Sequence, residues 1–255
     1  MFPSHPVLLF IAAVLGGAMN SVAGGGGFIV FPALIFAGLP PINANATNTV
    51  ALWPASVASA GAYRGELRGR ERWWVMVPLF VVTFFGAIAG ALLLLHTPQA
   101  TFMRLVPWLL LGATLLFAFG GKLTQRMRRQ GAPGHSVHAR AELIFLQLIV
   151  AIYIGYFGAG AGMLVLALFT VMGMENIHTM NAFKALIILC ANGVAVVTFI
   201  LAGAVFWPQA LLMILGAVAG GYGGAWYAQK LDQKVVRHVV IAIGAGMTVY
   251  FFWKS

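Results

Sequence analysis

The sequence predicts an all-α polytopic membrane protein made of two repeats. Of its 255 residues, 61% are hydrophobic and only 8% are charged, unlike a soluble globular domain. Several stretches, most clearly 73–95, are apolar over a length that can cross about 30 Å of hydrocarbon. A glycine-rich interruption lies near the start of each half. The predicted fold class is therefore two inverted repeats, each a glycine-broken re-entrant or discontinuous helical segment plus three transmembrane helices.

The first interruption is a run of four glycines at 24–27 within an apolar stretch. Each glycine disfavours a helix by about 1 kcal/mol relative to alanine. Inside a bilayer a helix can stop only where its freed N–H and C=O groups meet protein or a water-filled cavity. The N–H end of a broken helix can then hold an anion. The alternative is that these glycines only allow close helix packing, the role expected for Gly86 with Gly90 and for Gly216 with Gly220.

The second interruption, at 158–162, begins a segment that repeats the pattern of the first. Polar residues follow both interruptions, and the alignment needs one extra residue between the glycines and these polar residues. The aligned pairs are Gly27 and Gly162, Gly38 and Gly173, Asn45 and Asn181, Asn48 and Lys184, and Ser56 and Asn192. A repeated helix breaker with repeated polar residues is typical of transporters that bind substrate between two repeats.

Positive charge is confined to short connections between apolar stretches. The formal net charge is +10, and Lys and Arg concentrate at 64–72, 122–140 and 230–237. Such loops face the cytoplasm, so nucleic acid is not expected as a partner. With all three loops inside, each broken segment must return to its own side and the N-terminus lies outside, which inverts the repeats. The expected organisation is an N-terminal repeat at 1–121, the cytoplasmic basic linker at 122–140 and a C-terminal repeat at 141–255.

An anion inside the membrane needs hydrogen-bond donors and a positive potential. The backbone amides of both interruptions could supply donors, and Lys184 is the best candidate for an intramembrane cation. The alternative for Lys184 is an amine that reaches the headgroups. Asn45 and Asn48 share a helical face, and their alternative role is interhelical hydrogen bonding, worth about 0.6 kcal/mol. The candidate substrate-binding residues are Gly25, Gly26, Gly27, Phe28, Asn45, Thr47, Asn48, Gly160, Gly162, Asn181, Lys184 and Asn192.

The glycine run with Asn45-Ala46-Thr47 and Tyr63-Arg64, and the glycine-rich start of the second half with Lys184, resemble the TauE/SafE family. This family is often called the sulfite exporter family, and the resemblance covers nearly the whole chain. It implies a multi-pass carrier of the bacterial or archaeal inner membrane that exports sulfite, sulfoacetate or a related small organosulfur anion. The resemblance does not fix the substrate, because members of the family are diverse.

We therefore expect an inner-membrane anion exporter that works by alternating access at the repeat interface. A membrane scaffold without transport and an intramembrane enzyme are the alternatives. The enzyme is disfavoured because the six histidines fall near loops or span ends and Cys190 is the only cysteine. No catalytic residue, cofactor or metal is expected. The expected partners are a small anion and the lipid bilayer, and a homodimer is an option that the sequence leaves open. Coupling to protons, through a residue such as His178, and export driven by the membrane potential both remain open.

Overall fold

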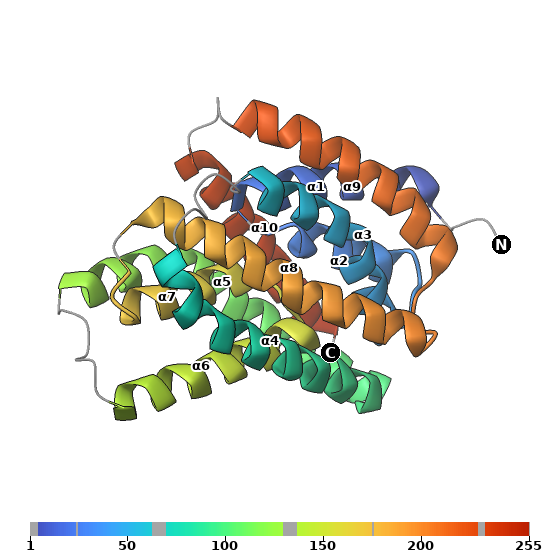
Figure 1. The fold of residues 1–255 in the computed structure, drawn as a ribbon. Coiled ribbons are helices and arrows are strands. Elements are labelled where there is room, and N and C mark those ends of the chain that lie inside the picture. The colour runs from blue at the N-terminus through green and yellow to red at the C-terminus, as the bar shows by residue number, and fades with distance from the viewer. Residues whose placement is uncertain are drawn as a thin grey trace.

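The computed structural model describes residues 5–23, 25–62, 70–129, 137–174, 176–228 and 233–254. All regular secondary structure in this part of the chain is α-helical, which confirms the all-α fold class (Figure 1). The helices of the first half are α1 (Pro6–Ala23), α2 (Gly27–Phe36), α3 (Pro41–Ala62), α4 (Arg70–His96) and α5 (Gln99–Arg129). Those of the second half are α6 (Val137–Tyr156), α7 (Ala161–Val171), α8 (Ile177–Leu201), α9 (Trp207–Ala228) and α10 (Gln233–Lys254).

Each half has the same order of elements. A first helix is followed after a short break by a second helix of 10 or 11 residues, α2 or α7, and then by three longer helices. Both breaks fall at the glycine-rich interruptions predicted from the sequence. Helices α5 and α6 extend into the range expected as the linker, and residues 130–136 lie outside the described part of the chain.

The main helix pairs each combine one helix from the first half with one from the second half. Helix α1 packs along α9, α4 packs along α6, and α3 packs against α8. Figure 1 shows the α1–α9 pair and the α4–α6 pair on different sides of the molecule, with α8 between them. Exchanging the equivalent helices of the two halves converts the first pair into the second and leaves the α3–α8 pair unchanged. The helix contacts therefore follow a pseudo-twofold relation between the halves.

Glycines allow a close approach of the two helices in the α4–α6 pair and in the α1–α9 pair. A Cβ added to Gly90 on α4 would lie 2.1 Å from the carbonyl oxygen of Ile152 on α6. A Cβ added to Gly220 on α9 would lie 1.9 Å from the carbonyl oxygen of Val14 on α1. Backbone meets backbone at both crossings, so these glycines form packing faces, as their spacing predicted.

The second helix of each half ends in the same way. Gly38 after α2 has φ +88° and Gly173 after α7 has φ +79°, a conformation that favours glycine. After α2 the N–H of Gly38 donates to Ile35 O and the N–H of Leu39 to Leu34 O, which is the Schellman pattern. After α7 the N–H of Gly173 donates to Thr170 O and that of Met174 to Phe169 O. This equivalence supports the alignment of the two halves.

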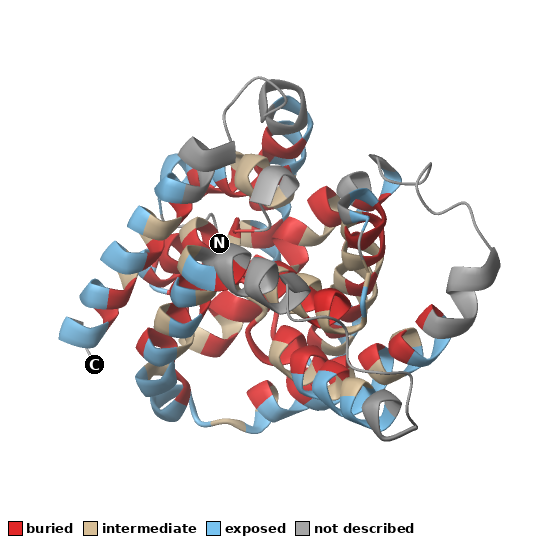
Figure 2. Cartoon of the chain, turned by 90° about the vertical axis from the view of Figure 1, so that its left-hand side faces the viewer, coloured by how far each residue is buried: buried red, intermediate tan, exposed pale blue. Residues whose placement is uncertain are grey.

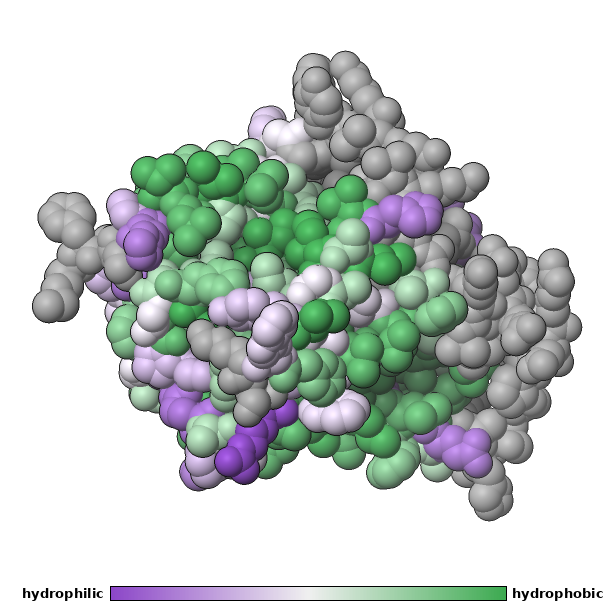
Figure 3. Space-filling view, turned by 180° about the vertical axis from the view of Figure 1, so that it is seen from behind, coloured by the Kyte–Doolittle hydropathy of each residue, from purple (hydrophilic) through white to green (hydrophobic). Residues whose placement is uncertain are grey.

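The outer surface of the bundle is apolar. Buried residues gather inside the bundle, while exposed residues lie on outward helix faces (Figure 2). Many outward side chains are large and apolar, such as Phe85 and Leu201, and hydrophobic residues cover much of the face in Figure 3. Helices long and apolar enough to cross a membrane are found at Met76–His96, Gln99–Gly120 and His178–Leu201. Such a surface suits contact with lipid rather than water.

We predict that Gly220→Ala destabilises the protein, because the new methyl group would collide with the backbone of α1. Overpacking of this kind costs about 1–3 kcal/mol, which a lower melting temperature in detergent would report. Gly112→Ala on α5 is the matched control, since a Cβ there meets nothing within 4 Å. Equal melting temperatures for the two variants would contradict the described packing of α1 on α9.

Candidate functional site

The first break folds the chain back on α1. Gly26 contacts Gly16, and a Cβ added to Gly26 would lie 2.2 Å from the Gly16 carbonyl oxygen. In a continuous helix, residues ten positions apart would be separated by about 15 Å. Only a residue without a side chain fits at this contact. The glycine run thus turns the chain so that α2 begins at Gly27 beside α1.

The second break is a short turn between α6 and α7. Gly158 has φ +74° and Gly160, the residue that caps α7, has φ +73°. A Cβ on Gly160 would also press on Ala113 of α5, 3.2 Å from its Cβ. The hydroxyl of Tyr153 donates a hydrogen bond to the carbonyl oxygen of Ala159, which holds the turn on the last turns of α6. Both glycines are needed for this conformation.

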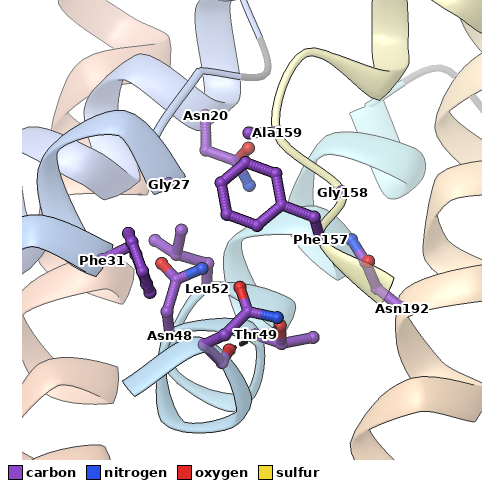
Figure 4. Close-up of a pocket in the computed structure, with 11 residues that line it drawn as sticks. Asn20, Gly27, Phe31, Asn48, Thr49, Leu52, Phe157, Gly158, Ala159 and Asn192 are labelled. Atoms are coloured by element: carbon purple, nitrogen blue, oxygen red, sulfur yellow. Dashed lines mark hydrogen bonds between the residues drawn. The ribbon is translucent and has the colours of Figure 1, made fainter. Parts of the chain in front are cut away.

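A small cavity of about 50 Å³ lies between the two breaks (Figure 4). Gly27 at the start of α2 reaches it from the first half, and residues 157–159 reach it from the second break. Helices α1, α3 and α8 complete its walls. The lining residues are Asn20, Gly27, Phe31, Asn45, Asn48, Thr49, Leu52, Phe157, Gly158, Ala159 and Asn192. Of these described residues, none carries an ionisable side chain.

Asn48 places an unpaired amide in the cavity. Its side chain is 7% exposed, and its Oδ1 is buried without a hydrogen-bond partner among the described residues. A Cβ on Gly27 would lie 3.5 Å from Asn48 Nδ2, so the amide faces the start of α2. Figure 4 shows it between the rings of Phe31 and Phe157. A buried polar group without a partner costs about 1–3 kcal/mol, so this amide is poised for a ligand or water.

Asn45 and Thr47 connect α3 to the second half. Asn45 lines the cavity, but its Nδ2 donates to the carbonyl oxygen of Tyr156, the last residue of α6, at 3.0 Å. Thr47 Oγ1 points elsewhere and accepts a hydrogen bond from the backbone N–H of Phe206, before α9, at 3.1 Å. Thr47 therefore supports the connection between halves and does not face the cavity. Asn45 does both.

Lys184 repeats the Gly27–Asn48 contact in the second half. A Cβ added to Gly162 would lie 3.6 Å from Lys184 Cδ, as one on Gly27 would lie beside the Asn48 amide. The Lys184 amine donates to Asn181 Oδ1 at 2.8 Å. The aligned pairs thus make equivalent contacts in the two halves. Gly162, Asn181 and Lys184 are, however, not among the residues that line the cavity.

The remaining candidates at the breaks have structural positions. The Phe28 side chain is fully buried in the hydrophobic core, and its N–H donates to the carbonyl oxygen of Gly25. Gly25 and Gly26 are buried, and Gly160 packs on α5. The structure therefore brings Gly27, Asn45, Asn48 and Asn192 to the cavity and leaves the other predicted residues outside its lining.

Sequence reasoning missed several lining residues, most importantly Asn20. Its Nδ2 donates to Ser56 Oγ at 3.3 Å, which links α1 to α3 at the edge of the cavity. Asn20 is the only side-chain amide in the apolar stretch that precedes the first glycine run, and this signal could have identified it. Gly158 and Ala159 belong to the second interruption but were not among the candidates, and Phe31, Thr49, Leu52 and Phe157 carried no comparable signal.

Known proteins are similar to this chain over nearly its whole length. The family profile described as "Sulfite exporter TauE/SafE" matches residues 9–251. A "Probable membrane transporter protein ORF9" from Sinorhizobium sp is 28% identical over 94% of this chain and 90% of its own length. The "Probable membrane transporter protein YfcA" of Escherichia coli K12 is 27% identical over 100% of this chain and 93% of its own. A "Probable membrane transporter protein" of Haemophilus influenzae is 28% identical over 94% and 92%. No solved structure matches.

We predict different effects on stability for two nearby amides of α3. Asn45→Leu removes the hydrogen bond to Tyr156 O and should lower the free energy of unfolding by about 1–3 kcal/mol. Asn48→Leu removes an amide with no protein partner and should leave stability unchanged or slightly higher. Thermal unfolding of both purified variants measures this difference. A larger loss for Asn48→Leu would mean that Asn48 is a structural amide.

Proposed function

The chain belongs to the TauE/SafE family, as the resemblance predicted, and from this premise we propose that it exports a small sulfur oxyanion or organosulfonate across the bacterial inner membrane. The chain is a membrane protein, and its relatives bear the names of membrane transporters. The proposed mechanism is alternating access, in which the two repeats rock about a central binding site. The proposed site is the cavity around Asn48.

One observation carries this proposal: a polar cavity lies where the breaks of both halves meet. The start of α2 brings the positive end of a helix dipole to the cavity. The unpaired Asn48 amide and the Asn192 side chain add polar groups from α3 and α8. Substrate sites of transporters built from inverted repeats occur between the repeats, at broken helices of this kind.

The size of the cavity favours a small solute. Its volume of about 50 Å³ is well below the roughly 300–1,000 Å³ of pockets for drug-sized ligands. One water molecule needs about 10–15 Å³ measured in this way. The cavity thus has room for a few water molecules or one small oxyanion, and not for a nucleotide or a peptide.

Hydrogen bonds close the end of the molecule where α3 begins, and one of them joins the two halves. The Asn43 side chain donates from Nδ2 to Ala204 O, after α8, at 2.9 Å and accepts from Gln99 Nε2, at the start of α5, at 3.2 Å. Gln99 Oε1 also accepts from the N–H of Ile42 at 2.8 Å. In the inverted topology this end faces outside. Breaking these bonds would be part of the step that releases the anion from the cell.

Export of an anion needs no coupling ion. The cell interior is negative, so each negative charge that leaves gains about 2.3 kcal/mol per 100 mV of membrane potential. The membrane potential can therefore drive net export through a carrier that only alternates between an inward-open and an outward-open state. This simplest scheme requires of the protein only the central site and the movement of its halves.

We predict that Asn48→Leu lowers sulfite efflux from proteoliposomes by about tenfold or more, because the substrate loses a buried amide partner. Gly27→Ala should also slow efflux, since the methyl group would occupy the cavity at 3.5 Å from the Asn48 amide without touching backbone. Gln147→Leu is the matched control. This variant removes another buried amide whose oxygen has no partner. Gln147 lies on α6, and its Nε2 donates to Thr83 Oγ1 outside the cavity lining.

Purified wild type and variants would be reconstituted at equal density, and efflux would be followed at an imposed membrane potential. Normal efflux by both Asn48→Leu and Gly27→Ala would remove the cavity from the transport path. Absence of sulfite and sulfonate transport by the wild type would contradict the proposed function itself.

A further inference from the structure

The positive potential at the cavity comes from the start of α2 and not from a lining side chain. No described lining residue is ionisable, and α2 starts at the cavity with Gly27, whereas α7 starts at Ala161, outside the lining. A helix N-terminus carries the equivalent of about half an elementary charge. The start of α2 therefore supplies about half a positive charge, which offsets part of one negative charge and leaves most of a double charge unbalanced.

The cavity also contains an unused hydrogen-bond acceptor. Asn48 Oδ1 is buried without a partner among the described residues, in a side chain that is only 7% exposed and lines the cavity (Figure 4). An amide oxygen can only accept a hydrogen bond. Turning the amide over exchanges its two ends but still leaves one donor and one acceptor for the ligand. A ligand that satisfies this side chain must therefore carry a donor as well as acceptor oxygens.

We propose that the transported species is a singly charged oxyanion that bears a hydrogen-bond donor, and that doubly charged oxyanions are rejected. This inference rests on the proposed function and narrows it to one charge state. The acceptor oxygens of the anion would face the start of α2, and its donor would face Asn48 Oδ1. A second negative charge would be desolvated in a cavity that has no ionisable side chain to pair with it, which is strongly unfavourable. A protonated sulfur oxyanion has both required properties.

Lys184 contributes in a different way. Its amine is bonded to Asn181 Oδ1 and its side chain packs over Gly162, outside the cavity lining. A positive charge at that position attracts any anion into the protein. Replacing it by methionine should therefore slow every anion without reversing the preference for one charge.

Three probes of similar size and tetrahedral shape separate charge from hydrogen bonding. Sulfate has two charges and no donor, methanesulfonate has one charge and no donor, and sulfamate has one charge and an amino group that can donate. Uptake of each would be measured in proteoliposomes containing the full-length wild type, Asn48→Leu, Lys184→Met or the control Gln147→Leu. The charge moved per molecule would be measured in parallel from the current.

We expect the wild type and Gln147→Leu to transport sulfamate about fivefold faster than methanesulfonate, and sulfate at least about tenfold more slowly than either. One charge should move per molecule. Asn48→Leu should reduce the sulfamate-to-methanesulfonate ratio to about one, and Lys184→Met should keep the order of the three probes.

Sulfate transport as fast as that of sulfamate, or an unchanged ratio in Asn48→Leu, would overturn the inference while leaving anion transport in place. A reversal of the order in Lys184→Met would assign the charge preference to Lys184 and would also overturn it. No transport of any probe or of sulfite by the wild type would overturn the proposed function together with the inference.

Discussion

Hydrocarbon offers no hydrogen-bond partner to the backbone of an interrupted helix, and the rest of the structure follows from this constraint. Each half of the chain stops a helix inside an apolar bundle, so the freed groups must be satisfied by protein. Part of this is done locally, through tight turns such as Phe28 N–H to Gly25 O and Met163 N–H to Gly160 O. Part is done by the other half, where Asn45 Nδ2 donates to Tyr156 O at the second break. The breaks therefore face each other, and the cavity lies between them.

The exchange of partners between the halves explains how a broken bundle holds together. Helix α1 packs mainly on α9, and α6 packs mainly on α4, so the first helix of each half is covered chiefly by the other half. The glycines on α4 and α9 allow backbone contact along both crossings, which gives van der Waals packing where no hydrophobic driving force exists between helices in lipid. The two pairs are joined at the centre by α3 and α8, which pack on each other and share the hydrogen bond from Trp53 Nε1 on α3 to Leu189 O on α8 at 3.3 Å.

The sequence predicted the features that depend on local chemistry. Glycine runs predicted the two breaks, and spacing predicted the packing faces at Gly90 and Gly220 and the equivalence of Asn48 with Lys184. It did not predict which polar residues face the cavity, because that depends on how the two halves pack. Thr47 and Asn48 are adjacent in sequence, yet Thr47 bonds to Phe206 N–H and Asn48 enters the cavity. For the same reason Lys184, the most conspicuous residue of the second half, lies outside the lining, and Asn20 was missed.

The central claim is that the anion binds between the two breaks, at Gly27 and Asn48. A crystal structure with selenite, whose selenium scatters anomalously, tests this most directly. The account predicts an anomalous peak in the cavity, within hydrogen-bond distance of the Asn48 amide and next to the start of α2. A peak beside Lys184 and Asn181 with an empty cavity would contradict it.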